Sequence, residues 1–318
     1  MGETHENGRV RFVTIDENND GQRLDNYLLS LLKGVPRSWI YRVLRTGEVR
    51  VNKGRCKPSR RLKSGDQVRV PPVDTARRDP GEIPEQVVDS IDNSIIYEDD
   101  LLIALNKPSG IAVHGGSGLS FGVIETLRNA RPNAPYLELA HRLDRDTSGC
   151  LLVAKKRSAL IELQELQRSG RIDKRYSALL AGKTRKGAWR CELPLRKNTL
   201  QGGERVVRVD PLGKAAATAF KVVQRFADAT LVEATLETGR THQIRVHAAA
   251  AGMPILGDPK YGDEEANRRL RDKGLRRLFL HAASLQFAWP NVRGGLSIRA
   301  PLPQDLQKVL DRLDEESI

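Results

Sequence analysis

One short polar run places a carboxylate between two arginines. Residues 141–149 read HRLDRDTSG, so Arg142 and Arg145 flank Asp144, and an apolar run, CLLVA at 150–154, follows directly. The apolar run predicts a buried strand, and Asp144 then lies on the turn that enters it, where a rigid scaffold can present its side chain to a ligand. A carboxylate close to cationic groups stays ionised and can act as a nucleophile or a base. The alternative is a structural turn held by ion pairs.

Histidines near these carboxylates raise a second kind of chemistry, metal-assisted hydrolysis. His141 lies close to Asp144 and Asp146 in the sequence, and His242 with His247 forms another candidate pair. His242 and His247 are five residues apart, which places them on opposite faces of the strand that we expect there and spoils joint ligation. We therefore interpret the histidines as hydrogen-bonded core or loop residues and predict no metal site.

Short strands, turns and helices must position these residues. Apolar runs predict strands at 101–105, 174–180 and 229–236, and the last one leads into the polar run ETGRTHQIRVH at 237–247. Periodic apolar residues predict helices at 121–130, 158–168 and 304–313. Tyr176 lies at the mouth of the second of these strands. The glycines of the loop at 112–118 match neither a Walker A loop nor a dinucleotide fingerprint, so we predict no nucleotide cofactor.

The N-terminal part has a separate, basic pattern. Apolar residues at helical spacing predict an amphipathic helix at 22–33, and Pro36 suits the first turn of a second helix that ends at Arg45. Short strands are predicted at 49–52 and 67–70. Between Lys33 and Lys63 there are eleven basic residues and one acid, whereas residues 82–100 hold seven acids and no base. The Pro-rich polar stretch at 71–81 between them is typical of a linker.

The composition narrows the class of protein. The chain has 318 residues and a formal net charge of +13, which suits a polyanionic partner. No apolar stretch approaches the ~20 residues that span a bilayer, and the N-terminus has no signal-peptide core, so we expect a soluble cytoplasmic protein. Three cysteines, far apart in the sequence, indicate neither a disulfide framework nor a zinc site.

The basic segment resembles a known module. The stretch GQRLDNYLLSLL, followed by PRSWIYRVLRTGEVRVNKGRCKPSRRLKSGDQVRV, is similar to the small alpha-L RNA-binding module of ribosomal proteins, aminoacyl-tRNA synthetases and RNA-modifying enzymes. The resemblance implies that the second helix and the following turn lie on structured RNA. The residues at the matching places are Arg37, Arg42, Arg45, Lys53 and Arg55. Clustered cations of this kind supply phosphate affinity that falls with salt.

The rest of the chain resembles the RluA-type pseudouridine synthases. The motifs LNKPSG, HRLDRDTSG, KRYSALL, GRTHQIRVHAAAAGMPILGD and FLHAASL occur in that family's order, and five ordered motifs are far more specific than one. The resemblance implies an α+β fold with a mixed, mostly antiparallel sheet. It also implies roles for four residues: Asp144 as the catalytic aspartate, Tyr176 stacking on the target base, Arg245 pairing with the carboxylate, and Arg142 filling the RNA stack.

Uridine isomerisation accounts for these residue types. The glycosidic bond to N1 must break, the uracil must turn while it is held, and a bond must form at C5. No metal or redox cofactor is required. The carboxylate of Asp144 can add to the base or sugar, or remove a sugar proton, and the sequence leaves both routes open. The target uridine must be flipped out of its stack, and an aromatic such as Tyr176 gives the freed base a flat surface worth ~1–3 kcal/mol.

The predicted activity is isomerisation of specific uridines in large-subunit ribosomal RNA. Transfer RNA is the alternative substrate, and a non-catalytic RNA-binding or ribosome-assembly factor is the alternative class, although such a factor has no need of Asp144. We expect a tail and first strand at 1–20, the RNA-binding module at 21–72, a linker at 73–90 and the catalytic domain at 91–318. Ribosomal RNA is the expected partner, and no obligate protein partner or membrane is predicted.

Overall fold

The computed structural model describes residues 10–32, 35, 37–73, 83–115, 121–199, 205–290 and 292–315. The chain forms two compact units that divide between Ile83 and Pro84. Each unit has its own hydrophobic core, so each is described by itself. In the described ranges, no helix is both long and apolar enough to cross a membrane.

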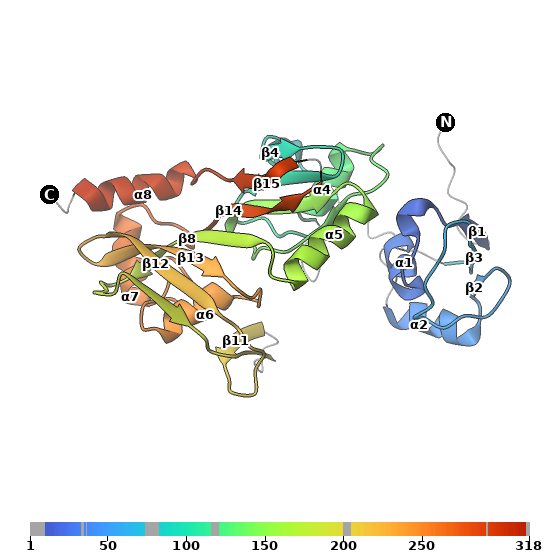
Figure 1. Cartoon of the computed structure of the whole chain (residues 1–318), viewed down its shortest axis with the longest axis horizontal. Coiled ribbons are helices and arrows are strands. Elements are labelled where there is room, and N and C mark those ends of the chain that lie inside the picture. Colours follow the sequence, from blue (N-terminus) through green and yellow to red (C-terminus); the bar gives the residue numbers. More distant parts are fainter. Residues whose placement is uncertain are drawn as a thin grey trace. The chain divides into compact units, whose positions relative to one another are not determined.

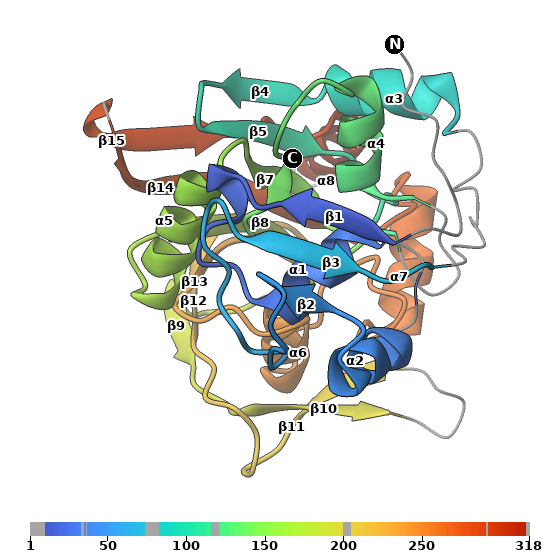
Figure 2. The same cartoon turned by 90° about the vertical axis from the view of Figure 1, so that its right-hand side faces the viewer.

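The N-terminal unit is a three-stranded antiparallel sheet with two helices (Figure 2). Its elements are β1 (Arg11–Thr14), a 3-10 turn (Glu17–Asn19), α1 (Leu24–Leu31), α2 (Arg37–Thr46), β2 (Arg50–Val51) and β3 (Gln67–Val70), with the strand order β1-β3-β2. Both predicted helices and both predicted strands are present. The apolar faces of α1 and α2 meet the strands in a core that includes Leu28, Ile40 and Val68, all fully buried.

The second unit is built on one mixed sheet (Figure 1). In the described residues the sheet has ten strands, in the order β4-β5-β7-β14-β8-β13-β12-β9, with β15 beside β14 and β6 beside β7. The strands are β4 (Ile95–Glu98), β5 (Leu102–Lys107), β6 (Glu138–Leu139), β7 (Ser148–Ala154), β8 (Asp173–Ala181), β9 (Ala188–Cys191), β12 (Thr218–Arg225), β13 (Ala229–Leu236), β14 (Leu280–Trp289) and β15 (Val292–Arg299). All pairs are antiparallel except β7 with β14. The predicted α+β fold with a mostly antiparallel sheet is confirmed.

Helices cover the two ends of this sheet. They are α3 (Glu85–Asp92), α4 (Val123–Ala130), α5 (Arg157–Arg168), α6 (Gln243–Ala250), α7 (Glu264–Asp272) and α8 (Gln304–Glu315). In Figure 1, α4 and α5 lie near the β4–β7 end, and α6, α7 and α8 lie near β8, β12 and β13. The C-terminal helix, predicted at 304–313, closes the latter end, because Leu306 and Leu310 pack in one cluster with Leu179 of β8.

The single parallel contact brings β7 and β14 unusually close at Gly149. Gly149 pairs with Ala282 and has φ +109°, and a Cβ at this position would overlap the carbonyl oxygen of Ala282. Only glycine fits such an approach. The last residue of the HRLDRDTSG run is therefore structural, and it fixes the strand that begins directly after the Asp144 loop.

The second unit also contains a separate two-stranded sheet, β10 (Leu195–Thr199) with β11 (Arg205–Val209) (Figure 2). Its buried face joins α6 through a small cluster of Leu195, Val207 and Val246. The hairpin is thereby packed directly against the helix that carries Arg245.

Two expectations need correction or adjustment. The strand expected through His242 and His247 is wrong, because residues 243–250 form helix α6. Residues 85–90, within the segment expected to be a linker, begin helix α3 and belong to the second unit. Residues 74–82 of that segment lie outside the described part of the chain.

Candidate active site

Asp144 lies where the sequence places it, on the turn between β6 and β7. All seven residues of β7 are buried, so the strand is a fixed base for this turn. The Asp144 side chain is 26 % exposed and opens into a pocket of about 540 Å³. Residues from the turn, β8 and the start of α6 line the pocket, among them His141, Arg142, Asp144, Tyr176, Arg240, His242 and Arg245.

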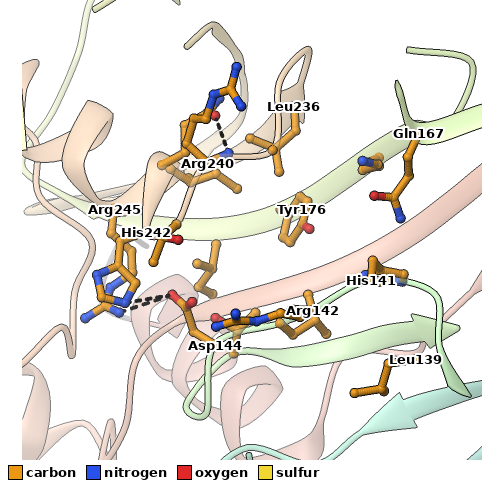
Figure 3. Close-up of a pocket in the computed structure, with 18 of the residues that line it drawn as sticks. Leu139, His141, Arg142, Asp144, Gln167, Tyr176, Leu236, Arg240, His242 and Arg245 are labelled. Atoms are coloured by element: carbon orange, nitrogen blue, oxygen red, sulfur yellow. Dashed lines mark hydrogen bonds and ion pairs between the residues drawn. The ribbon is translucent and has the colours of Figure 1, made fainter. Parts of the chain in front are cut away.

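Arg245 binds the Asp144 carboxylate, and a second carboxylate, that of Asp258, binds Arg245. Its Nη1 donates to Asp144 Oδ2 at 3.2 Å (Figure 3), and its Nε and Nη2 donate to the two oxygens of Asp258 at 2.7 and 2.8 Å. The Arg245 side chain is 6 % exposed and that of Asp258 is fully buried. A planar guanidinium suits this double task, because it can bind one carboxylate bidentately and still offer another N–H to a second.

Electrostatics keep the Arg245–Asp258 pair charged despite its burial. Burial opposes the charge on Arg245, but the Asp258 and Asp144 carboxylates outweigh it and raise the pKa of the guanidinium. Burial likewise opposes ionisation of Asp258, but hydrogen bonds from Arg245 and from the backbone N–H groups of Lys260 and Tyr261 lower its pKa. The guanidinium also lies over the Tyr261 ring, 5.0 Å from its centroid, which adds a cation–π contact.

His242 approaches the same carboxylate oxygen from the N-terminal end of α6. Its Nε2 lies 3.7 Å from Asp144 Oδ2, and its Nδ1 lies 2.8 Å from the Tyr261 hydroxyl. That hydroxyl accepts from the backbone N–H of Val207, so its own proton is free to be donated to Nδ1. Burial lowers the pKa of His242. A neutral ring that accepts at Nδ1 carries its proton on Nε2, which then points at Asp144.

The backbone at His242 is what turns the chain toward Asp144. His242 has φ +53° and ψ +20°, in the left-handed region, and it is the N-cap of α6. Gln243 supports this turn, since its amide group bonds Thr218 and its oxygen accepts from the backbone N–H of Arg240. A strained non-glycine residue at a ligand pocket is typical of functional sites, because the surrounding structure must hold it in place.

The LNKPSG turn is hydrogen-bonded to the loop that carries Asp144. Lys107 is fully buried, and its Nζ donates to the carbonyls of Pro108, Ile111 and Arg145 at 2.7, 2.9 and 3.0 Å. Burial lowers the pKa of Lys107 to about 7, while three carbonyl acceptors favour the ammonium form, which alone has three donors. Ser109 also donates to the Asp146 carbonyl at 2.7 Å. These contacts span 38 and 37 residues of sequence, so two separate motifs form one rigid turn.

Tyr176 and Arg142 lie on the pocket wall at different depths. Tyr176 projects from β8 and is 7 % exposed, whereas Arg142 is exposed on the Asp144 loop (Figure 3). Burial, and then the nearby Asp144 carboxylate, raise the pKa of the Tyr176 hydroxyl, so this ring is neutral at physiological pH. Within the described part of the chain Arg142 has no ion pair, which leaves its guanidinium available to a ligand.

One expectation about the neighbours of Asp144 changes, and two hold. Arg145 was expected close to Asp144, but its Nε bonds Asp146 at 3.0 Å. Arg245, which the family resemblance implied as the partner, does contact Asp144. The interpretation of the histidines as hydrogen-bonded core or loop residues holds for His247. His247 is fully buried and bonds Thr218 and the carbonyl of Leu193. In the described residues no group of three or more His, Cys, Asp or Glu side chains has the geometry to hold a metal ion.

Three residues of the site had no predicted role, and two of them lie in the quoted motifs. Asp258 ends the GMPILGD motif, Tyr261 follows it, and Lys107 lies in LNKPSG. The signal for Asp258 was a carboxylate at the end of an otherwise apolar run, where burial requires a cationic partner. Nothing in the sequence names that partner, because Arg245 lies on another element.

The cations predicted to bind RNA lie on the N-terminal unit. Arg42 and Arg45 are exposed on α2, and Lys53 and Arg55 are exposed on the turn after β2. Lys53 has φ +68°, so the turn presents its side chain from a left-handed backbone. The side chain of Arg37 lies outside the described residues.

A carboxylate fixed by arginine in a basic pocket, with a separate cationic module, defines an enzyme that acts on RNA. Comparison with known families agrees. Residues 101–250 match the model of the RNA pseudouridylate synthases, and residues 22–68 match the S4 domain. The chain belongs to the RNA pseudouridylate synthase family, as the motifs indicated.

Relatives make the assignment more specific. The chain is 53% identical over 312 residues to the "Ribosomal large subunit pseudouridine synthase C" of Pasteurella multocida (strain Pm70), covering 98% of this chain and 96% of that one. It is 54% identical over 308 residues to the protein of the same name from Escherichia coli (strain K12), covering 96% and 97%. The order of the two modules and the segment AVHGGSGLSFGVIE also resemble this group.

Solved structures share the fold of the second unit. "Human RNA Pseudouridylate Synthase Domain Containing 4" aligns with a TM-score of 0.60 and 27% identity, covering 72% of this chain and 96% of that one. "Human RNA Pseudouridylate Synthase Domain Containing 1" aligns with a TM-score of 0.57 and 25% identity, covering 70% and 93%.

Proposed function

We propose that this enzyme converts specific uridines of large-subunit ribosomal RNA to pseudouridine, with Asp144 as the catalytic carboxylate. The observation that supports the proposal is the Asp144–Arg245–Asp258 arrangement. Arg245 holds the Asp144 carboxylate so that it faces a pocket that Tyr176 also lines. The names of the relatives support the substrate, since proteins with at least half of their residues in common act on the large ribosomal subunit.

The pocket fits a flipped nucleotide. A uridine inside a stacked helix offers its C1′ and C5 atoms to no protein group, so it must swing out to react. Tyr176 then supplies a flat, neutral surface for the uracil during its rotation. The exposed guanidinium of Arg142 enters the gap that the base leaves, where its plane can stack between the neighbouring bases.

Asp144 acts on the flipped uridine as nucleophile or base. Its carboxylate either adds to the base or sugar or removes a sugar proton. Both routes break the N1–C1′ bond and form the C5–C1′ bond without hydrolysis; the C5 hydrogen leaves as a proton, N1 gains a proton, and Asp144 is released unchanged. Arg245 and the Nε2–H of His242 both face Oδ2. The other oxygen, Oδ1, has no protein hydrogen bond in the described structure, so it is the atom that meets the substrate.

The two units divide the work. We assign RNA capture to the module at residues 21–72, through Arg37, Arg42, Arg45, Lys53 and Arg55, and the isomerisation to the unit from Pro84 onward. Phosphate contacts position an RNA without reading its sequence, so the choice of uridine depends on RNA shape and on unpaired nucleotides that the protein can reach.

The proposal is tested with purified protein and three protein-free RNAs: large-subunit ribosomal RNA, small-subunit ribosomal RNA and a transfer RNA pool. Carbodiimide labelling and primer extension locate each new pseudouridine. We expect discrete sites in large-subunit RNA with the wild type. Asp144→Asn keeps the size of the side chain and removes its charge, and we expect on the order of 10³-fold or greater loss of rate with RNA affinity retained.

The outcomes separate the alternatives. Modification of transfer RNA alone would replace the substrate and keep the chemistry. Equal rates for the wild type and Asp144→Asn would remove the catalytic role of Asp144. No pseudouridine in any RNA, with RNA binding intact, would favour a binding or assembly factor. Asp146→Asn is the matched control, since this aspartate is on the same turn but pairs with Arg145.

A further inference from the structure

A second hollow, of about 580 Å³, lies on the N-terminal unit beside α2 and the turn that follows β2. This volume is within the range of small-molecule sites, about 300–1,000 Å³. Its walls combine one aromatic ring, three cations and apolar groups: Tyr41, Leu44, Arg45, Arg55, Cys56, Lys57 and Pro58. The hollow lies within one unit and shares no residue with the pocket around Asp144.

Tyr41 is an exposed ring that the fold nevertheless holds in place. It is 44% exposed, yet its hydroxyl donates to Asp25 Oδ2 at 3.1 Å. Asp25 is 2% exposed and is fixed by Arg23, which donates from Nε and Nη2 at 3.1 and 2.7 Å. A ring that is anchored at its hydroxyl and open at its face loses little conformational freedom when a flat ligand stacks on it.

The cations around Tyr41 have no partner in the described part of the chain. Arg45 is one helical turn after Tyr41, on the same face of α2. Neither Arg45, Arg55 nor Lys57 forms an ion pair or a side-chain hydrogen bond there, whereas the nearby Arg23 has an acidic partner. Three unpaired cations around one ring suit a ligand with negative charge beside a flat group.

Gly47 helps to keep one of these cations in place. It ends α2 with φ +77°, and a Cβ at this position would lie 2.6 Å from Arg55 Nε. The absence of a side chain therefore lets the Arg55 side chain lie against the end of the helix, at the edge of the hollow.

We propose that this hollow binds an unpaired RNA nucleotide, with the base stacked on Tyr41 and the adjacent phosphates held by Arg45, Arg55 and Lys57. The proposal rests on the proposed function, because it takes RNA as the ligand. A paired base hides both faces in the helix, so a stacking site selects a bulge, loop or single strand. The module would then read an unpaired nucleotide in addition to binding the phosphate backbone.

The test measures binding of the full-length protein to two probes of equal charge. One is an eight-nucleotide oligoadenylate, and the other is the same ribose-phosphate chain without bases. Adenosine is chosen because it cannot be isomerised as uridine is. The ratio of the two dissociation constants reports the contribution of the bases. Tyr41→Leu keeps an apolar side chain and removes the ring, and Phe12→Leu removes another exposed ring, on β1, as the control.

We expect Tyr41→Leu to weaken oligoadenylate binding about fivefold or more and to leave the abasic chain unchanged, since stacking is worth ~1–3 kcal/mol per base. Tyr41→Phe keeps the ring and should lose much less. Arg45→Gln or Lys57→Gln should weaken both probes alike and reduce the salt dependence of binding. Circular dichroism melting checks that each variant is folded.

Equal loss of both probes in Tyr41→Leu would make the hollow a phosphate site only, and no loss for either would remove the proposal. Pseudouridine formation in large-subunit RNA is measured at saturating RNA with the same proteins. If the wild type forms no pseudouridine, the proposed function fails. If the wild type is active and Tyr41→Leu binds oligoadenylate normally, the stacking site alone fails.

Discussion

The two units use arginine in opposite ways. In the N-terminal unit Arg45 and Arg55 are exposed and have no acidic partner in the described residues, so their charge is available to a ligand. In the second unit Arg245 is almost fully buried and is shared between Asp258 and Asp144. The first arrangement favours affinity for many phosphates. In the second arrangement Arg245 is not available to an external anion, because it fixes the proposed catalytic carboxylate of Asp144 in place.

The difference teaches where each unit is sensitive to change. A free surface charge contributes little to stability, so the module can vary its cations at small cost to the fold. A buried charge whose partner is removed destabilises the whole site, because the remaining charge has neither water nor a counter-ion. Mutations should therefore affect ligand binding in the module and both folding and rate in the catalytic unit.

Asp258→Asn is the strongest test of this contrast. The change removes the charge behind Arg245, and we expect a loss of roughly 3–5 kcal/mol in the free energy of unfolding. The freed guanidinium can turn fully onto Asp144, so we expect about 100-fold loss of kcat as well. Urea denaturation and pseudouridine formation on large-subunit RNA measure the two effects.

Asp173→Asn is the matched control for this change. Asp173 pairs with Arg175 in the same unit, but both side chains are about a third or more exposed. We expect less than about 1 kcal/mol of destabilisation from this variant and no change in kcat. If Asp258→Asn were as mild as Asp173→Asn, the Arg245–Asp258 pair would not support the site.

Much of the site follows from the sequence, and the failures have physical causes. One pocket contains Asp144, Tyr176 and Arg245. Their motifs lie at the ends of strands of one sheet or on a helix packed against it. The strand expected over residues 242–247 is wrong, although Ile244 and Val246 alternate with polar neighbours there. The left-handed turn at His242 and the following alanines favour a helix there instead.

The partners of the charges were harder to predict than the elements. Arg145 is next to Asp144 by one residue, but the turn directs it to Asp146. Asp144 and Arg245 are 101 residues apart, and their contact depends on how the sheet brings two elements together. A pairing of this kind is a property of the tertiary fold, which local propensity and spacing do not contain. In the module, by contrast, charge composition alone indicated the ligand.

Lowering the pH should destabilise the second unit more than the N-terminal unit. All described histidines belong to the second unit, and burial lowers the pKa of His141, to about 4, and also those of His242, His247 and His281. Unfolded histidines take up a proton near pH 6.5, whereas these stay neutral in the folded state. Stability from this source is complete above about pH 6.5 and is lost as the pH falls toward 4.

His141 alone should account for up to about 3 kcal/mol of this loss. Its Nε2 accepts from the backbone N–H of Leu152 at 3.1 Å, which only the neutral ring can do. In the module, the pKa values of Asp25 and Asp66 are lowered by hydrogen bonds and nearby cations, so both stay ionised and the module should keep its stability from pH 7 to pH 5. Hydrogen exchange with mass spectrometry, corrected for the intrinsic rates, resolves the two units.

His141→Gln sharpens this prediction, because an amide oxygen can accept the Leu152 N–H and does not titrate. The variant should reduce the acid sensitivity of the catalytic unit and leave the module unchanged. Parallel loss of protection in both units between pH 7 and pH 5 would contradict the assignment of acid sensitivity to buried histidines.

Tyr261→Phe probes the smallest effect, the loss of one neutral hydroxyl behind the charged groups. The ring under Arg245 remains, but Val207 loses its acceptor and His242 loses its donor. We expect about 1–3 kcal/mol of destabilisation, since a buried N–H is left without a partner, and a decrease in kcat of about tenfold or less. Tyr97→Phe is the control, because Tyr97 lies on β4 and its hydroxyl bonds Asp99, directly after that strand and outside the pocket.

The pH profile of kcat shows whether the Tyr261 hydroxyl positions His242 or only stabilises the fold. Without the Tyr261 hydroxyl, His242 can exchange its tautomer and direct an unprotonated Nε2 at Asp144, which would repel the carboxylate instead of holding it. Tyr261→Phe should therefore alter the acid limb of the profile, whereas Tyr97→Phe should lower stability and leave the profile unchanged. If the two variants gave the same profile, the hydroxyl would serve only packing, and the fixed cluster around Asp144 would end at Arg245 and Asp258.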